Sequence, residues 1–249
     1  MFRHALITGA SGAIGSALAR RLRGRAEAMT LVDQNASALA PLAHELDACA
    51  LAWDLADVDA LDARWSDATT ERDVDLLINC AGILDFRSVT AMPWDAAKKV
   101  LDVDLVAPLW LQRRAAGSMR HGAAIVNVAS LAGVVPLRGA TYYGAAKAGF
   151  AMASEIARVE LAPHGVHVVT VYPGPVRSSL EQKGRDQLQR SPLARVLPSG
   201  DPQTLAERIV LALDQRRARV VYPFPYDLAP RFPRLASAIT RRFSPSPLA

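Results

Sequence analysis

The chain has 249 residues, of which 51% are hydrophobic and 21% charged, with 15 Gly and 16 Pro. This composition is ordinary for one globular domain and excludes a disordered or collagen-like chain. Cys49 and Cys80 are the only two cysteines, too few for a secreted, disulfide-stapled module of this length. We therefore expect a cytoplasmic protein without a signal peptide.

Positive charge is concentrated toward the end of the chain. Residues 1–176 hold 16 Lys and Arg against 18 Asp and Glu, whereas residues 177–249 hold 13 against 6. Such asymmetry occurs in proteins that bind nucleic acid, anionic lipid or acidic substrates, but a solvated arginine-rich surface is commoner. No apolar stretch reaches the roughly 20 residues that a membrane span needs. We expect neither a nucleic-acid partner nor a membrane-spanning segment.

Short apolar runs alternate with longer alanine-rich segments of helical periodicity, which is typical of βαβ units. Several of the runs are apolar on both faces, as in a parallel sheet covered by helices on both sides. The sequence therefore predicts a single doubly wound α/β domain. The strands are predicted at residues 2–7, 28–32, 49–52, 74–79, 123–129, 166–172 and 219–222, and the helices at residues 12–23, 35–46, 55–68, 94–119, 140–163 and 202–216.

Two segments lack this regularity. Residues 173–201 are rich in Pro, Gly, Ser and charge, so we predict a long mobile loop, in which residues 175–200 form a lid over the substrate. Residues 223–249 are predicted to form an extension rich in Pro and Arg, around one short helix. The predicted core of the domain therefore comprises residues 1–222.

The motif TGASGAIG at residues 8–15 follows the first predicted strand and begins the first helix. Glycine lets the backbone turn tightly and approach a pyrophosphate, and the amides at a helix N-terminus favour the anion. In this context the motif predicts a dinucleotide-binding loop, with Gly9, Ser11, Gly12, Ile14 and Gly15 as cofactor contacts. An ordinary glycine-rich turn is the alternative interpretation.

Asp33 ends the second predicted strand, 18 residues after Gly15. A carboxylate at this place can accept hydrogen bonds from the adenosine ribose hydroxyls and repels a 2′-phosphate. Gln34, which follows it, is neutral. The sequence therefore favours NAD as cofactor over NADP, and the alternative interpretation of Asp33 is a helix cap.

Tyr143 and Lys147 are four residues apart in a predicted helix, so their side chains are neighbours on one face. A nearby cation favours the phenolate and lowers the pKa of a tyrosine toward the range useful for acid-base catalysis. Ser130 follows the strand predicted at 123–129, where its hydroxyl could bond a substrate oxygen. A Tyr and a Lys at this spacing are, by themselves, common by chance.

These residues and three further motifs together resemble the compact short-chain dehydrogenases/reductases, over residues 3–222. Asp54-Leu55 resembles the family's adenine-contacting acid after the third strand, and NCAG at residues 79–82 is similar to its NNAG. PGPVRS at 173–178 resembles its PG motif with Ser in place of the usual Thr. The resemblance implies a Rossmann-like fold of about seven strands. It also assigns cofactor contacts to Asp54, Leu55, Asn79, Ala81, Gly82, Pro173, Gly174, Val176 and Ser178, as well as to Tyr143 and Lys147.

The resemblance implies catalytic roles for three residues. Tyr143 would exchange a proton with the substrate oxygen while hydride moves to or from the nicotinamide. Ser130 would orient that oxygen and stabilise charge on it, and Lys147 would bond the nicotinamide ribose and lower the Tyr143 pKa.

Asp104 is a departure from the family, which usually has Asn at this position to support a water in a proton relay with the lysine. A carboxylate here could alter the pKa values of the relay if the side chain takes part. If only the backbone carbonyl takes part in the relay, Asp can replace the usual Asn, and Asp104 would be a fourth catalytic residue. A helix acid paired with a nearby cation is the structural alternative.

The expected function is oxidoreduction between a secondary alcohol and a ketone, with NAD preferred. Loops at residues 84–93, 131–138 and 176–197 mix apolar residues with Arg and Lys, which indicates a largely apolar small-molecule substrate. The alternatives are a 3-oxoacyl-thioester reductase and a catalytically silent, NAD-sensing regulatory protein. The family implies a homodimer or homotetramer, and the small residues of the helix at 140–163 suit close contact between helices.

No metal site is expected. His164 and His167 are three residues apart without cysteine or acid ligands nearby, so a surface pair is the favoured interpretation. The extension at residues 223–249 mixes aromatic residues with arginine. Membrane contact through this extension is the less favoured hypothesis, against packing on the domain or on another subunit.

Overall fold

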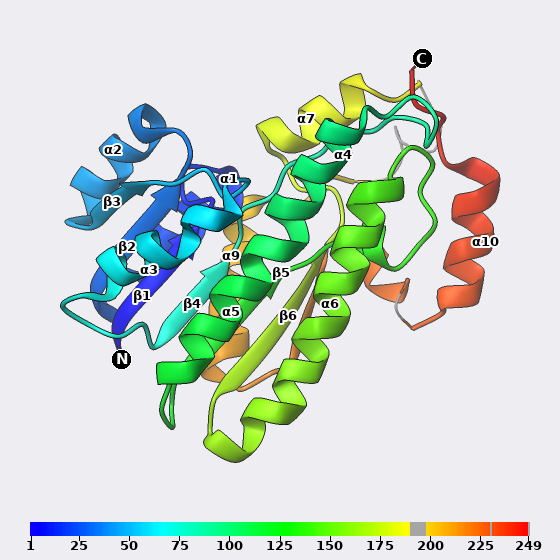
Figure 1. The fold of residues 1–249 in the computed structure, drawn as a ribbon. Coiled ribbons are helices and arrows are strands. Elements are labelled where there is room, and N and C mark those ends of the chain that lie inside the picture. Colours follow the sequence, from blue (N-terminus) through cyan, green and yellow to red (C-terminus); the bar gives the residue numbers. More distant parts are fainter. Residues whose placement is uncertain (190–197, 230, 249) are drawn as a thin grey trace.

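The computed structural model describes residues 1–189, 198–229 and 231–248. A parallel sheet of seven strands forms its centre, in the order β3-β2-β1-β4-β5-β6-β7 (Figure 1). The order reverses between β1 and β4, which creates a crevice at the carboxyl ends of these two strands. The strands are β1 (Phe2–Thr8), β2 (Ala26–Asp33), β3 (Cys49–Ala52), β4 (Leu76–Asn79), β5 (Ala124–Val128), β6 (His167–Pro173) and β7 (Arg219–Tyr222).

Helices cover both faces of the sheet, and the predicted doubly wound fold is confirmed. On one face, Leu18, Leu39 and Ile209 of three helices pack against buried strand residues. On the other face, Leu61 and Leu111 do the same. The first group of helices is α1 (Ala13–Leu22), α2 (Ala36–Leu46) and α9 (Pro202–Asp214), and the opposite face carries α3 (Leu61–Thr69), α4 (Trp94–Leu101), α5 (Ala107–Ser118) and α6 (Thr141–Leu161).

The prediction of one continuous α-helix at residues 94–119 is wrong in one respect. A π-helical turn, Asp102–Val106, separates α4 from α5. The chain stays helical through this turn, so the apolar periodicity gave no sign of a break. Asp104 in the π turn is fully buried. Such turns are rare and often occur at functional sites.

The loop predicted at 173–201 also needs correction, because it contains the helix α7 (Ser179–Asp186). The Ser178 side chain accepts a hydrogen bond from the Glu181 amide and caps this helix. Glu181 and Arg185 are ion-paired one turn apart. Leu180 is the one large apolar residue of α7, so the sequence lacked the periodicity that predicts a helix. Residues 190–197 of the predicted lid lie outside the described residues.

After residue 222 the chain forms the predicted short helix, α10 (Pro233–Phe243), at the edge of the molecule (Figure 1). The Arg138 amide donates to the Ser244 hydroxyl at 3.0 Å and ties the end of this helix to the loop before α6. Within the described part of the chain, no helix combines the length and apolar character needed to cross a membrane.

Candidate active site

The glycine loop between β1 and α1 is closed so tightly that two of its glycines cannot be replaced without displacing the backbone. Gly9 has φ +66°, and a Cβ there would lie 2.8 Å from the Ala81 amide nitrogen. A Cβ on Gly15 would lie 2.1 Å from the Gly9 carbonyl oxygen. The Thr8 hydroxyl accepts from the amides of Cys80 and Ala81 at 3.1 and 3.2 Å, which fixes this loop against the one after β4.

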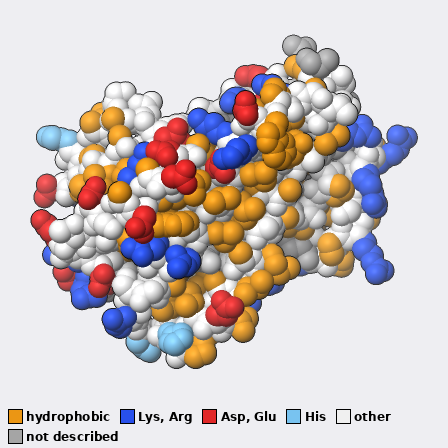
Figure 2. Space-filling model, in the orientation of Figure 1, with side chains coloured by type: hydrophobic (Ala, Val, Ile, Leu, Met, Phe, Trp, Pro, Cys, Tyr) orange, Lys and Arg blue, Asp and Glu red, His pale blue; other side chains and the backbone are white. Residues whose placement is uncertain are grey.

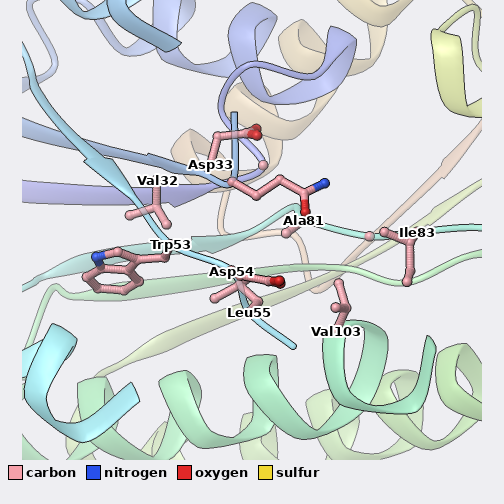
Figure 3. Close-up of a pocket in the computed structure, with 11 residues that line it drawn as sticks. Val32, Asp33, Trp53, Asp54, Leu55, Ala81, Ile83 and Val103 are labelled. Atoms are coloured by element: carbon pink, nitrogen blue, oxygen red, sulfur yellow. The ribbon is translucent and has the colours of Figure 1, made fainter. Parts of the chain in front are cut away.

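A pocket opens beside this loop, at the carboxyl ends of β1 to β4 (Figure 3). The pocket lies where the strand order reverses, the usual dinucleotide position in such sheets. The glycines leave the bare backbone of the loop accessible to a pyrophosphate, so the site fits a dinucleotide. Its lining residues are Gly9, Val32, Asp33, Gln34, Trp53, Asp54, Leu55, Ala81, Gly82, Ile83 and Val103.

Asp33 lies at the mouth of this pocket with its carboxylate held in place by the backbone. One oxygen accepts from the Ser11 amide and the other from the Asn35 amide, both at 3.1 Å. Asp33 thus joins the end of β2 to the glycine loop. Among the described residues that line the pocket there are two carboxylates, Asp33 and Asp54, and no Lys or Arg.

Several lining residues were not predicted from the sequence, and Trp53 is the largest. Its amide donates to the Asp33 carbonyl at 3.0 Å, and its side chain is only 5% exposed. Val32 and Val103 form apolar walls from β2 and from the π turn. The position of Trp53 directly after a predicted strand was a usable signal, since ligands bind beyond strand ends.

The predicted catalytic residues come together at the carboxyl end of β5, where the first turns of α6 pack. Ser130 follows β5 and is 9% exposed, while Tyr143 and Lys147 lie in the first two turns of α6. The Lys147 ammonium lies 5.9 Å from the centre of the Tyr143 ring. A hydrogen bond between Ser130 and the Tyr143 phenol lowers the pKa of the tyrosine. The Ser130 hydroxyl also accepts from the Ala132 amide at 3.1 Å.

Asp104 lies against Lys147. Its carboxylate is 3.0 Å from the ammonium, and the two side chains are 0% and 5% exposed. The Ile83 amide donates to the other Asp104 oxygen at 3.2 Å, and Lys147 also donates to the Val128 carbonyl at 3.2 Å. A Cβ on Gly82 would lie 2.7 Å from the Asp104 carboxylate. The acid therefore forms a direct, buried ion pair with the lysine of the predicted catalytic group.

This pair determines the proton affinities of the site. Burial alone lowers the pKa of Lys147, but the Asp104 carboxylate and the Tyr143 phenol outweigh it, so the pKa is raised and the lysine is charged. Burial raises the pKa of Tyr143, Lys147 lowers it, and Asp104 raises it again. The pKa of Tyr143 remains above its ordinary value as a result.

Comparison with known proteins identifies the family of this arrangement. Residues 3–189 match the short chain dehydrogenase family. The chain belongs to the short-chain dehydrogenases. Among curated relatives, it is 31% identical over 223 residues to the 3-oxoacyl-[acyl-carrier-protein] reductase FabG of Rickettsia conorii, covering 84% of this chain and 89% of the relative. The protein is therefore an oxidoreductase of this family.

Solved structures of short-chain dehydrogenases have the same fold. A 4-hydroxyisoleucine dehydrogenase complexed with NADH superposes with a TM-score of 0.78 at 23% identity, over 88% of this chain and 96% of the other. A short-chain dehydrogenase from Sphingobium yanoikuyae in complex with NADPH also has a TM-score of 0.78, at 25% identity, over 97% of this chain and 94% of the other.

Some residues predicted as cofactor contacts of this dehydrogenase have mainly structural contacts. The Asn79 amide donates to Asn127 at 3.0 Å, and Asn79 is 1% exposed. Val176 is buried in the core cluster of the sheet. The Gly174 amide donates to the Tyr222 carbonyl at 2.7 Å and joins β6 to β7. Pro173, the last residue of β6, is paired with Tyr222.

Apolar side chains surround one side of Tyr143. Leu84 and Phe86, from the loop after β4, form a cluster with Tyr143 and with Leu180 of α7. A Cβ on Gly184 would lie 2.5 Å from the Leu84 side chain, so α7 lies close over this loop. The helix therefore covers the Tyr143 side of the site. The described ranges hold no group of three metal-ligating side chains.

Proposed function

We propose that this short-chain dehydrogenase interconverts a secondary alcohol and a ketone and prefers NAD(H). The observation that carries the cofactor preference is Asp33, whose fixed carboxylate lies in the dinucleotide pocket. It can accept hydrogen bonds from a ribose diol, whereas a 2′-phosphate there would meet a like charge. The apolar cluster around Tyr143 supports a largely apolar substrate.

The chemistry requires a nicotinamide dinucleotide, which supplies or accepts the hydride when bound. The glycine loop would hold its pyrophosphate, and Lys147 would hold the ribose next to the nicotinamide. In ketone reduction, the Tyr143 phenol donates its proton to the carbonyl oxygen that becomes the hydroxyl. The Ser130 hydroxyl bonds the same oxygen and stabilises its developing charge. In alcohol oxidation the proton moves in the opposite direction.

Replacing Asp33 tests the cofactor preference. The wild-type protein should use NAD(H) with a kcat/KM at least about tenfold above that for NADP(H), as expected from the loss of one charge-assisted contact and the gain of one repulsion. Asp33→Ser should weaken NAD(H) and improve NADP(H), because the ribose acceptor and the repelling charge are both removed. The measurement is kcat/KM for both cofactors on a panel of secondary alcohols and ketones.

Asp54→Asn provides the matched control, because Asp54 also lines the pocket and its side chain accepts from the Ala56 amide at 3.0 Å. This change should alter the affinity for both cofactors by a similar factor and leave their ratio near that of the wild type. A wild-type preference for NADP(H) would overturn the proposed role of Asp33.

Reduction of a 3-oxoacyl thioester is the second candidate function. The observation in its favour is the 31% identity to the reductase FabG of Rickettsia conorii. Asp33 speaks against it, since this reductive chemistry usually draws on NADPH. A 3-oxoacyl thioester in the substrate panel distinguishes the two candidates. NADH binding without turnover on the whole panel would instead favour the NAD-sensing alternative, which the presence of Ser130, Tyr143 and Lys147 together makes the weakest of the three.

We also propose that two copies of the chain associate through the outer face of α4 and α6. Figure 2 shows a continuous apolar band over this face. Met152, Ile156 and Val159 recur at helical spacing on α6 and are 63%, 50% and 66% exposed, and Trp94 of α4 is 66% exposed. Apolar faces of this extent usually mark an interface between proteins.

Ile156→Glu should dissociate the proposed dimer, because it places a charge in the middle of the apolar band. Light scattering coupled to size exclusion should give the mass of two chains for the wild type and of one chain for the variant. Glu160→Gln, an exposed change one turn further along α6, should remain dimeric. A monomeric wild-type protein would contradict the proposal.

We propose that the protein resides in the cytoplasm. Cys49 and Cys80 are both free, and Cys49 is exposed. Burial raises the pKa of the Cys80 thiol to about 12, which keeps it protonated and unreactive. Free, unpaired thiols are typical of proteins in a reducing compartment.

A further inference from the structure

Helix α10 presents a row of large apolar side chains to solvent. Phe232, directly before the helix, and Leu235, Ile239 and Phe243 within it are 57%, 60%, 44% and 55% exposed. Their spacing of three, four and four residues places them along one side of the helix. We call these four residues the apolar stripe.

Arginines occupy the other side of the same helix. Arg234 and Arg241 lie about 100° to 180° around the axis from the members of the apolar stripe, by the rotation of about 100° per residue in an α-helix. Arg242 flanks the stripe. All three are exposed, and Figure 2 shows basic side chains along this edge of the molecule. The sequence from residue 228 to residue 249 contains no Asp or Glu.

The apolar stripe is not used to attach α10 to the domain. The partly buried residues of the helix are Ala236, Ser237 and Thr240, which are small or polar. The remaining attachment is polar, because Arg138 donates to the Ser244 hydroxyl at 3.0 Å and to the Arg241 carbonyl at 3.2 Å. The domain therefore holds the helix by its least apolar side and leaves the stripe outward.

The segment before the helix exposes two further apolar side chains. Phe224 is 70% exposed and Leu228 is 41% exposed. Both lie in the segment between β7 and α10. Phe224 and Leu228 thus add two exposed apolar side chains to the four of the stripe, just before a helix whose charges are all positive.

We propose that α10 and the turn before it bind the surface of an anionic lipid bilayer. An interfacial helix buries an apolar side at the level of the acyl chains and places cationic side chains among the headgroups, and α10 has both parts. Charge decides between a bilayer and a second copy of the chain. Pairing α10 with its copy would bring the arginines of two acid-free helices together, whereas anionic headgroups complement them. This inference is independent of the proposed reaction.

Flotation of the purified full-length protein with lipid vesicles tests the proposal. We expect the protein to float with vesicles of equal parts phosphatidylcholine and phosphatidylglycerol, and at least about tenfold less with phosphatidylcholine alone, since each Arg near an anionic surface adds to binding. The bound fraction should fall as salt is raised, because surface electrostatics are screened.

Two double variants separate the contributions of the two sides. Ile239→Ser with Phe243→Ser removes half of the apolar stripe, and Arg234→Ser with Arg241→Ser removes two cations; each should lower vesicle binding by about tenfold or more. Arg23→Ser with Arg113→Ser removes two exposed cations outside α10 and should leave binding unchanged. A thermal unfolding midpoint equal to that of the wild type would show that a variant is folded.

Three results would overturn the proposal. The first is absence of flotation of the wild type with anionic vesicles. The second is equal loss of binding in the control variant, which would mean that net charge rather than α10 acts. The third is a fall in oligomer mass in the variant of Ile239 and Phe243 without any change in vesicle binding, which would show that a second copy covers the apolar stripe.

Discussion

Tyr143→Phe should lower kcat by about a hundredfold to ten-thousandfold, the usual contribution of a positioned general acid or base. The phenol lies beside Ser130 and can transfer a proton to a substrate oxygen bound there, and Phe retains the ring that packs against Phe86 at 6.4 Å between centroids. Affinity for the dinucleotide, measured by fluorescence titration, should change only a few-fold. Steady-state rates of the variant and the wild type provide the test.

Tyr142→Phe is the matched control. Tyr142 is the adjacent tyrosine, but its ring packs edge-on against Trp94, at 6.3 Å between centroids, away from Lys147. Its removal should leave kcat within about threefold of the wild type, as for a surface substitution away from the chemistry. A large loss in Tyr142→Phe with little loss in Tyr143→Phe would reverse the assignment of the acid.

The pH profile gives a second readout of the same change. Because burial keeps the pKa of Tyr143 above its ordinary value, the phenol is protonated at neutral pH. Ketone reduction, which needs the protonated form, should therefore hold through neutral pH and fall as pH rises through that pKa. Alcohol oxidation should rise over the same range. In Tyr143→Phe the residual rates should lose this dependence.

Lys147→Met should reduce the free energy of unfolding by about 3–5 kcal/mol at neutral pH. The substitution fills the same space but leaves Asp104, which is fully buried, without its cation. The variant can avoid a buried, unpaired charge by protonating Asp104. Protonation costs about 1.4 kcal/mol of free energy for each unit by which the pH exceeds the ordinary aspartate pKa of about 4. Denaturant unfolding at a series of pH values is the measurement.

The sign of the pH dependence follows from this protonation. In Lys147→Met the folded state holds a proton on Asp104 that the unfolded state releases above about pH 4, so the loss of stability grows with pH and shrinks toward acid. Adding Asp104→Asn should restore most of the stability without restoring activity. A single variant within about 1 kcal/mol of the wild type at pH 7 would contradict a charged pair at this place.

The sheet could be predicted from the sequence because its strands are short apolar runs with clear boundaries. The strand predicted at residues 49–52 coincides with β3, and that at 219–222 with β7. The helix α7 could not be predicted, because one apolar residue, Leu180, gives no periodicity. Its stability comes from a side-chain cap and an ion pair, which composition does not reveal.

The site could be predicted to the extent that its residues follow strand ends or share a helix face. Tyr143 and Lys147 satisfy the second condition, and Asp33 satisfies the first. The sequence did not decide whether Asp104 acts through its backbone or its side chain. The structure places the Asp104 side chain 3.0 Å from Lys147, in a turn 43 residues earlier in the chain, and the part of Asp104 that acts stays a prediction.

The π turn at Asp102–Val106 also sets the angular phase between the helices on either side of it. A π turn contains one residue more than an α turn, so the residues after it are offset by about 100° in angular phase from those before it. If this stretch wound as a regular α-helix without losing a residue, Leu111 and Ala115, both fully buried, would rotate by that angle away from the sheet. A one-residue deletion within the turn would instead give a continuous α-helix with the same side of α5 on the sheet, so the π turn accommodates one residue that the packing of α5 does not require.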